Sequence, residues 1–232
     1  MLRIIPYDTL GHANYGWLDA KYHFSFGNYY DPGRLNFGAL RVINDDVIRA
    51  GAGFDSHPHK DMEIITYVRK GAITHRDNNG NIGRTAKGDV QVMSAGNGIF
   101  HSEYNFENEE TNLYQIWIEP KEKGITPKWG SQEFPREPVE NTLPLLVSGD
   151  NTAPLHIHQD ARIYGGRLNQ GTGIEHHIRG QAYLLVSDGD IEIISQLLRK
   201  GDGAELTDMS SVNIKAQTDA EVLIIEVPAS EH

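Results

Sequence analysis

Two short segments of this chain carry histidine and carboxylate side chains at a spacing that suits metal binding. The first segment holds His57 and His59, and the second holds His101 and Glu103. On an extended strand alternate side chains point to the same face, so each segment presents its two polar groups together. Three imidazoles and one carboxylate on two separate strands can converge on one cation inside a barrel. These four side chains are therefore candidate metal ligands.

The donor types restrict the metal and its role. The chain contains no cysteine, which excludes thiolate ligands, disulfides and iron–sulfur clusters. Imidazole and carboxylate ligands suit Fe, Ni, Co, Mn, Cu or Zn. Four protein donors around an octahedral ion would leave two positions open for water, substrate or O₂. Open positions are typical of a catalytic metal rather than a structural one.

The segments that must position these residues are short and strand-like. Glycine is frequent, at 24 of 232 residues, which suits many tight turns, and no segment keeps a 3.6-residue apolar period. The predicted strands are rich in Val, Ile, Leu, Tyr or Trp, and Gly, Asp, Asn or Pro closes each of them. They are Ala39–Ile43, Ile64–Val68, Val90–Met93, Leu113–Ile118, Leu143–Val147, Ala182–Val186, Ile191–Ile194 and Glu221–Val227. Short strands of this kind are typical of sandwiches and barrels.

The two halves of the chain share a pattern of strands and turns. Tyr67–Gly71 followed by Lys87–Asp89 in the first half resembles Leu185–Gly189 followed by Lys200–Asp202 in the second. Each half then ends with an apolar strand and a proline. Such a repeat predicts two similar β-barrels in tandem, joined within the Pro-rich and charged stretch Pro127–Pro144.

The spacing of glycine, histidine and glutamate around the candidate ligands resembles two known motifs. Gly51-x5-His57-x-His59-x3-Glu63-x7-Gly71 resembles the first cupin motif, and Gly88-x5-Ser94-Ala-Gly96 followed by His101-x3-Asn105 resembles the second. Ser94 replaces the usual proline of the second motif, a departure shared with the pirin branch of the cupins. The segments HPHKDME at 57–63 and MSAGNGIFHSE at 93–103 also resemble pirins, in particular their bacterial quercetin dioxygenase-like members.

The resemblance implies an all-β bicupin fold, with two tandem jelly-roll β-barrels and few short helices. Residues 1–130 would form an N-terminal cupin barrel with the metal site, and residues 131–232 a C-terminal cupin barrel that has lost its site. Alignment of the two halves places Glu175 opposite His57 and His177 opposite His59. No histidine follows His177 before the last residue, so nothing can take the part of His101.

The resemblance also implies an activity, a metal and roles for the ligands. It implies a metal-dependent dioxygenase that opens the ring of flavonols such as quercetin with O₂ and releases CO. His57, His59, His101 and Glu103 would hold one divalent transition metal ion, with iron preferred and Ni, Mn, Co, Cu or Zn as alternatives. Glu103 would also be the general base, and Glu63 would have a supporting role. The cellular substrate could equally be another enolic metabolite.

A second class of function stays open beside the enzyme. Some pirins act as metal-binding, redox-sensing regulatory proteins, and this chain could do so without physiological flavonol turnover. Its formal net charge of −11 makes direct contact with nucleic acid or with an anionic membrane unfavourable. The opening residues lack the basic start and apolar run of a signal peptide, so we expect a cytoplasmic protein, with the monomer mildly preferred.

The remaining histidines and aromatic residues have plainer interpretations. His156 and His158 are expected on a half-exposed strand, and the Glu175–His177 segment as a relic or a polar barrel lip. His12 and His23 are expected to make structural hydrogen bonds. His75 and Asp77 either orient the ligands or lie on a solvated strand face. The residues expected in the core or in the pocket wall are Trp117, Tyr67 and Phe100.

Overall fold

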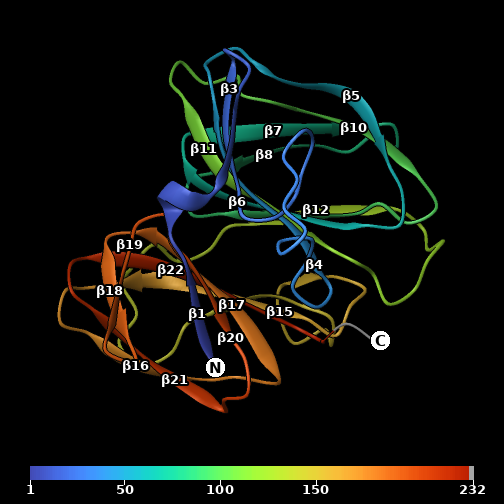
Figure 1. The fold of residues 1–232 in the computed structure, drawn as a ribbon. Helices are drawn as coiled ribbons and strands as arrows, with labels where there is room; N and C mark the ends of the chain where they lie inside the picture. The colour runs from blue at the N-terminus through green and yellow to red at the C-terminus, as the bar shows by residue number, and fades with distance from the viewer. Residues whose placement is uncertain (230–232) are drawn as a thin grey trace.

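The strands of the protein form two barrels, stacked one on the other (Figure 1). The structure is a computed structural model that describes residues 1–229. Within that range the one helical element is the 3-10 turn η1 (Tyr7–Thr9), and no helix there is long and apolar enough to cross a membrane. Each barrel pairs a seven-stranded sheet with a four-stranded sheet. The prediction of an all-β protein with two barrels and few short helices is therefore confirmed.

The first barrel holds the candidate ligands. Its large sheet runs, in spatial order, β12 (Lys128–Gln132), β9 (Val90–Ser94), β6 (Glu63–Lys70), β11 (Thr111–Ile118), β4 (Leu40–Ile48), β3 (Leu18–Tyr22) and β2 (Gly11–Asn14). Its small sheet runs β5 (Gly53–His59), β10 (Ile99–Tyr104), β7 (Ala72–Asp77) and β8 (Ile82–Ala86).

The second barrel repeats this plan. Its large sheet runs β1 (Leu2–Ile5), β20 (Gly203–Leu206), β17 (Gln181–Asp188), β22 (Ala220–Val227), β15 (Arg162–Leu168), β13 (Leu145–Ser148) and β14 (Leu155–His156). Its small sheet runs β16 (Gly173–His177), β21 (Ser211–Ala216), β18 (Asp190–Ile193) and β19 (Gln196–Arg199). Neighbouring strands are antiparallel apart from β13 and β14, which are parallel.

Two strands bear on the expected division of the chain into residues 1–130 and 131–232. The N-terminal strand β1 pairs with β20 and so belongs to the sheet of the second barrel. Strand β12 pairs with β9 inside the stretch expected to be the join, and it continues to Gln132. The first barrel is therefore built from β2 to β12, and the first strand of the chain, β1, forms an edge of the large sheet of the second barrel.

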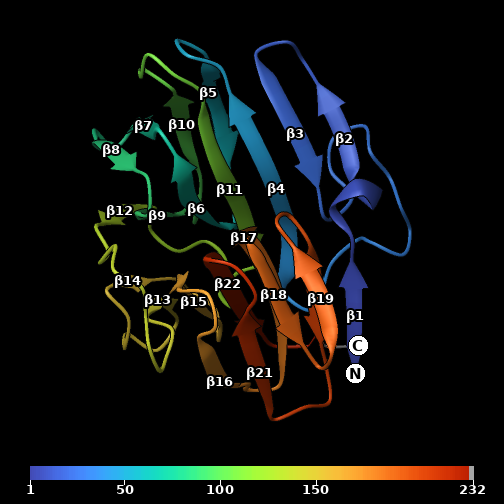
Figure 2. The same ribbon diagram turned by 90° about the vertical axis from the view of Figure 1, so that its left-hand side faces the viewer.

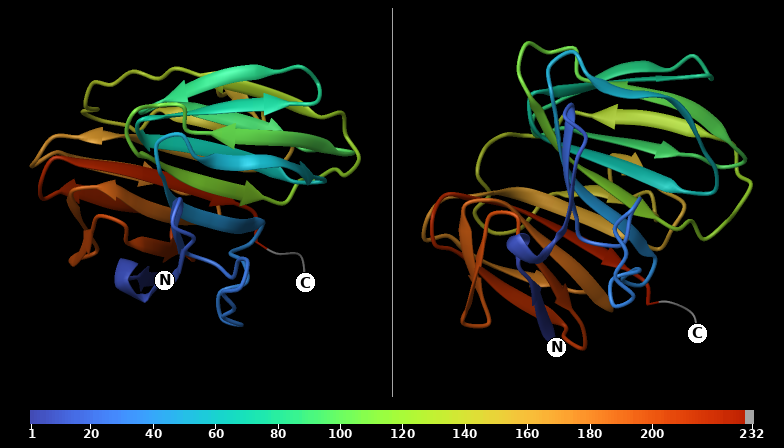
Figure 3. Two further views of the ribbon diagram at one scale, coloured as in Figure 1. Left: turned by 90° about the horizontal axis from the view of Figure 1, so that it is seen from above. Right: turned by 45° about the horizontal axis from the view of Figure 1, so that its top comes forward.

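The two large sheets face each other across the middle of the molecule (Figures 2 and 3). The largest hydrophobic cluster lies between them and takes residues from both, including Ile65 and Ile116 from the first barrel and Leu223 and Ile225 from the second. Central strands such as β22 are therefore buried on both faces, which explains why they read as continuous apolar runs in the sequence.

The interiors of the two barrels differ. One cluster that includes Leu184, Val186 and Ile214 fills the second barrel. In the first barrel the buried apolar residues form two smaller clusters, one around Leu113 and one around Ile99. The space between these two clusters contains the histidines and a row of polar side chains.

Candidate metal centre and its pocket

Three of the candidate ligands converge at one point of the first barrel. His57 on β5 is the cross-strand partner of His101 on β10, and His59 lies two residues further along the same face of β5. The ring centroids of these three imidazoles are 4.5 to 4.9 Å apart. Their donor atoms all lie within 4.8 Å of one another, which is a grouping that could hold a metal ion.

Burial keeps the imidazoles of His59 and His101 neutral, as metal ligation requires. Burial, followed by the neighbouring histidines, lowers the pKa of His59 to about 3. The pKa of His101 falls to about 3 for the same two reasons. Each ring can therefore offer an unprotonated nitrogen near neutral pH.

Hydrogen bonds decide which nitrogen of His101 is unprotonated. Nε2 of His75 donates to Asp77 at 2.9 Å, which leaves Nδ1 of His75 as an acceptor. Nδ1 of His101 lies 3.3 Å from that acceptor and therefore carries the proton. Burial opposes ionisation of Asp77, but hydrogen bonds from His75 and Asn81 lower the pKa of its carboxyl below the usual value. The lone pair of His101 is thus on Nε2.

The same reasoning applies to His57. Its Nδ1 donates to the carbonyl of Asp55 at 2.6 Å, so its lone pair is also on Nε2. The two Nε2 atoms of His57 and His101 face each other at 3.1 Å. Two nitrogens bound at right angles to one ion at about 2.1 Å would be about 3.0 Å apart. The donor set therefore fits a transition metal ion.

Glu103 lies beside this group but is held by other partners. It groups with His75 and His101 rather than with His57 and His59. Its Oε1 accepts a hydrogen bond from Nε2 of Gln91 at 2.6 Å, and its Oε2 accepts one from Nε2 of Gln115 at 2.8 Å. The structure thus brings three predicted ligands together and places the fourth next to His101.

The two glutamines belong to a polar row that crosses the large sheet. Successive cross-strand partners along this row are Tyr22, Asn44, Gln115, Thr66 and Gln91. All five residues are on inward-facing positions of their strands, and Gln91 lies next to Thr66 through a hydrogen bond of 3.3 Å. The motifs gave no signal for Gln91 or Gln115, because pairing between distant strands, rather than local spacing, brings them to Glu103.

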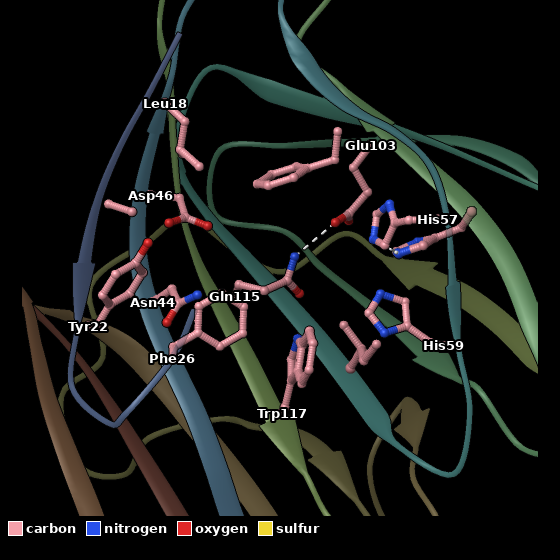
Figure 4. A pocket seen from close by; sticks show the side chains of 14 residues that line it. Leu18, Tyr22, Phe26, Asn44, Asp46, His57, His59, Glu103, Gln115 and Trp117 are labelled. Atoms are coloured by element: carbon pink, nitrogen blue, oxygen red, sulfur yellow. Dashed lines mark hydrogen bonds between the residues drawn. The ribbon is translucent and has the colours of Figure 1, made fainter. Parts of the chain in front are cut away.

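The histidines open into a pocket with a volume of about 200 Å³ (Figure 4). Its walls are apolar, with Phe54 near His57, and Phe26 in edge contact with Trp117 at a centroid distance of 5.5 Å. Trp117 also packs edge-on against His59 at 5.0 Å. An apolar cavity with a few polar groups at defined places is the usual form of a small-molecule site.

The comparisons with known proteins now decide the family. The pirin family model matches residues 5–118, and the model of the quercetinase C-terminal cupin domain matches residues 145–227. A Pseudomonas aeruginosa protein, provisionally named a quercetin 2,3-dioxygenase, is 50% identical over 231 residues, which cover 98% of this chain and 100% of that protein. The chain belongs to the pirin family.

Other relatives of this pirin agree. The quercetin 2,3-dioxygenase of Escherichia coli K12 is 44% identical over 94% of this chain and 95% of its own length. The crystal structure of YhhW from Escherichia coli has a TM-score of 0.94 and 43% identity, covering 100% of both chains. A structure of the bacterial pirin YhhW in complex with nickel(II) has a TM-score of 0.92 and 42% identity over 99% of this chain and 100% of that one. The fold is therefore the expected bicupin.

Several expectations about individual residues of this pirin can now be checked. His75 and Asp77 have fully buried side chains, so the solvated-face alternative is wrong. Phe100 is 52% exposed, so its placement in the core or pocket wall is also wrong. Trp117 lines the pocket and Tyr67 packs between the two large sheets, as expected.

Glu63 lies on the face of β6 opposite the pocket. Its neighbour Ile64 lines the pocket, and alternation turns Glu63 towards the second barrel. Its Oε2 accepts a hydrogen bond from Ser94 at 2.6 Å, and burial raises the pKa of its carboxyl. These contacts suit the supporting role expected for Glu63.

The equivalent strand of the second pirin barrel turns a different residue inward. On β16, Glu175 and His177 are exposed while His176 is buried. Nε2 of His176 lies 3.0 Å from Oε1 of Glu226 on β22. The sequence alignment placed Glu175 and His177 opposite the ligand histidines, but both side chains lie on the outer face of β16. The alignment is therefore displaced by one residue, because His176 is the residue that points inward.

Proposed function

We propose that this pirin is a metal-dependent dioxygenase that opens the ring of flavonol-like substrates. The observation that carries the proposal is the convergence of three imidazoles at one end of an apolar, aromatic-walled pocket. Relatives at 44–50% identity that are named quercetin 2,3-dioxygenase support the choice of substrate class. Two glutamines of the polar row, Gln91 and Gln115, hold the carboxylate of Glu103 beside the histidines.

In this proposal His57, His59, His101 and Glu103 hold one divalent transition metal ion. Iron is our first choice, and nickel is the main alternative because a related pirin has been crystallised with nickel(II). When bound, the ion would supply a Lewis acid beside which an enolic hydroxyl and O₂ are brought together.

Glu103 is proposed as the general base for the substrate hydroxyl. An ionised carboxylate has about four acceptor sites, so hydrogen bonds from Gln91, Gln115 and Thr66 leave capacity for one further donor. These two amides fix the orientation of the carboxylate, and the buried surroundings exclude competing water. Glu103 can then accept the proton of an enol that binds next to His101.

The walls of the pocket suit a flat aromatic substrate. Trp117 and Phe26 meet at an interplanar angle of 87°, so each presents apolar ring surface in a different direction. Phe54 and Leu18 line the same cavity. A planar ring that lies between these side chains would be held without covalent contact, and its hydroxyl would be directed to Glu103.

The substitution Glu103→Gln tests the role of the base. We expect kcat with quercetin to fall by about 10²–10⁴-fold, because an amide cannot accept the proton, while metal content falls only in part. The measurements are O₂ uptake and CO release by metal-loaded protein, together with elemental analysis of protein purified without added metal. Glu175→Gln, an exposed carboxylate on β16, is the control and should retain wild-type rates.

Two results would contradict the proposal at different points. Wild-type kcat in E103Q would show that Glu103 is not the base. Background O₂ uptake by iron-loaded and nickel-loaded wild type would contradict dioxygenase activity towards flavonols. The regulatory function would then be favoured, and it predicts a change in partner affinity when the bound metal is oxidised.

A further inference from the structure

Two buried oxygens stand at the end of the pocket that lies away from the histidines (Figure 4). Asp46 and Asn44 are two residues apart on β4, so both side chains point into the barrel. They are only 2% and 4% exposed. Within residues 1–229, Oδ1 of Asp46 and Oδ1 of Asn44 have no hydrogen-bond partner.

Asp45 lies between them on β4 and has hydrogen-bond partners, so the lack of partners belongs to the inward face of the strand. Asp45 points to the opposite face of β4, where its Oδ2 pairs with Arg69 at 2.6 Å and its Oδ1 accepts a hydrogen bond from Asn112 at 2.8 Å. Buried polar oxygens normally have a donor in this way. The two inward oxygens require a donor that enters the pocket, which is water in the free protein or a hydroxyl in a complex.

These oxygens are connected to the proposed catalytic end. Asn44 is the cross-strand partner of Gln115, whose Nε2 donates to Glu103. Phe26 and Trp117 form the wall between the two ends. A flat molecule against this wall would place one edge at Glu103 and the other at Asn44 and Asp46.

The carboxyl of Asp46 is also suited to neutral hydroxyl groups rather than to cations. Burial, and then the charges of Asp45 and Glu103, hold its pKa well above the usual value. A raised pKa favours the protonated form of the carboxyl, and in that form it offers one acceptor and one donor to a ligand hydroxyl. The pairing of the two side chains therefore matches the hydrogen-bonding pattern of phenols.

We propose that Asp46 and Asn44 form a subsite that binds a phenolic hydroxyl on the part of the substrate remote from the reacting enol. The subsite rests on the proposed dioxygenase function and narrows its substrate class to polyhydroxylated flavonols. Singly hydroxylated flavonols would fill the apolar pocket but leave the two oxygens without a ligand donor.

Binding of two ligands under anaerobic conditions tests the subsite without turnover. Quercetin carries several phenolic hydroxyls, whereas 3-hydroxyflavone carries the enolic hydroxyl alone. We expect metal-loaded wild type to bind quercetin at least about tenfold more tightly in isothermal titration calorimetry, which corresponds to one good hydrogen bond. Asp46→Leu and Asn44→Leu should each reduce this ratio to about threefold or less.

Measurements of Tm, together with a conservative variant, distinguish a role in ligand binding from a structural role. Leucine replaces a side chain whose Oδ1 has no hydrogen-bond partner by an apolar one of similar volume, so we expect the Tm of both leucine variants to stay level or rise. Asp46→Asn keeps Oδ1 and should retain most of the preference for quercetin. If Asp46→Leu fails to fold, Asn44→Leu still provides the test.

The outcomes distinguish this subsite from the reaction itself. Equal affinity of wild type for the two ligands would overturn the subsite, as would an unchanged ratio in a folded leucine variant. A preference for quercetin that both leucine variants lose supports it. If that preference is found while O₂ uptake stays at background, the dioxygenase proposal fails and the binding subsite stands.

Discussion

His101 is oriented by groups on both sides of its ring. Asp77 and His75 determine that its proton is on Nδ1, so its Nε2 lone pair faces His57. Trp129 stacks on His75 at 4.9 Å with an interplanar angle of 11°, which holds that ring in place. A ligand fixed in this way loses little entropy when it binds a cation, and partners of ligand histidines commonly affect metal affinity.

Removing this support should weaken metal binding. We expect Asp77→Asn and His75→Phe to lower the affinity for iron or nickel by about 10–100-fold, because His101 loses the partner that fixes its tautomer. Competition with a chromogenic chelator measures the affinity. His177→Phe, an exposed histidine on β16, is the control. Affinities of both variants within twofold of wild type would show that the chain of hydrogen bonds is not needed.

At this scale the sequence predicts the histidines well and their partners poorly. His57, His59 and His101 could be found because local i,i+2 spacing places them on one face. Phe100 could have been corrected by the same rule, since an inward His101 requires an outward neighbour. Gln91 has no such local signal, because it reaches Glu103 only through the register between β6 and β9.

The strands differ in how clearly the sequence predicts them. Strands β6, β17 and β22 are buried on both faces, so they appear as continuous apolar runs and were predicted. Strands of the small sheets, such as β8 and β21, have one solvent-facing side and no continuous apolar run, so the sequence analysis does not predict them. Strand pairings such as β1 with β20 join residues too far apart in the chain for local pattern to show.

We expect any side chain at Gly83 on β8 to destabilise the protein. A Cβ there would lie 2.0 Å from the Trp129 ring, which is itself stacked on His75. We expect Gly83→Ala to lower the free energy of unfolding by about 1–3 kcal/mol, because the indole must move out of its packed position. Urea denaturation measures this change.

Gly173 on β16 provides the matched control for Gly83. A Cβ at Gly173 would meet nothing within 4 Å, so Gly173→Ala should change the free energy of unfolding by no more than about 0.5 kcal/mol. Equal stability of both variants would show that Trp129 is free to shift, and the support of His75 by stacking would then be doubtful.

The two barrels are joined by polar contacts as well as by the shared apolar layer. Arg69 on β6 pairs with Asp45 and donates from Nε to Ser187 on β17 at 3.0 Å. Nδ1 of His23, just after β3, lies 3.0 Å from the hydroxyl of Tyr183 on β17. Because these groups are buried between the barrels, we expect the molecule to unfold as one unit rather than barrel by barrel.

His23 should make the stability of this joined structure sensitive to acid. Burial, and then the charges of Arg34 and Arg69, lower the pKa of His23 to about 3 from a usual value of 6.5. Below pH 6.5 the unfolded chain therefore binds a proton at this position that the folded protein does not bind until about pH 3. The stability is fully present above pH 6.5 and falls as the pH drops, by up to about 1.4 kcal/mol per pH unit for this group.

The substitution His23→Asn isolates this contribution, because asparagine does not titrate and can still reach Tyr183 from the Nδ1 position. We expect the free energy of unfolding of H23N to decline less steeply than that of wild type between pH 6.5 and pH 4, and the two curves to run parallel above pH 7. Urea denaturation of both proteins across this range measures the difference in slope. Identical slopes for H23N and wild type would mean that His23 takes up its proton in the folded protein, and therefore that water reaches the layer between the barrels.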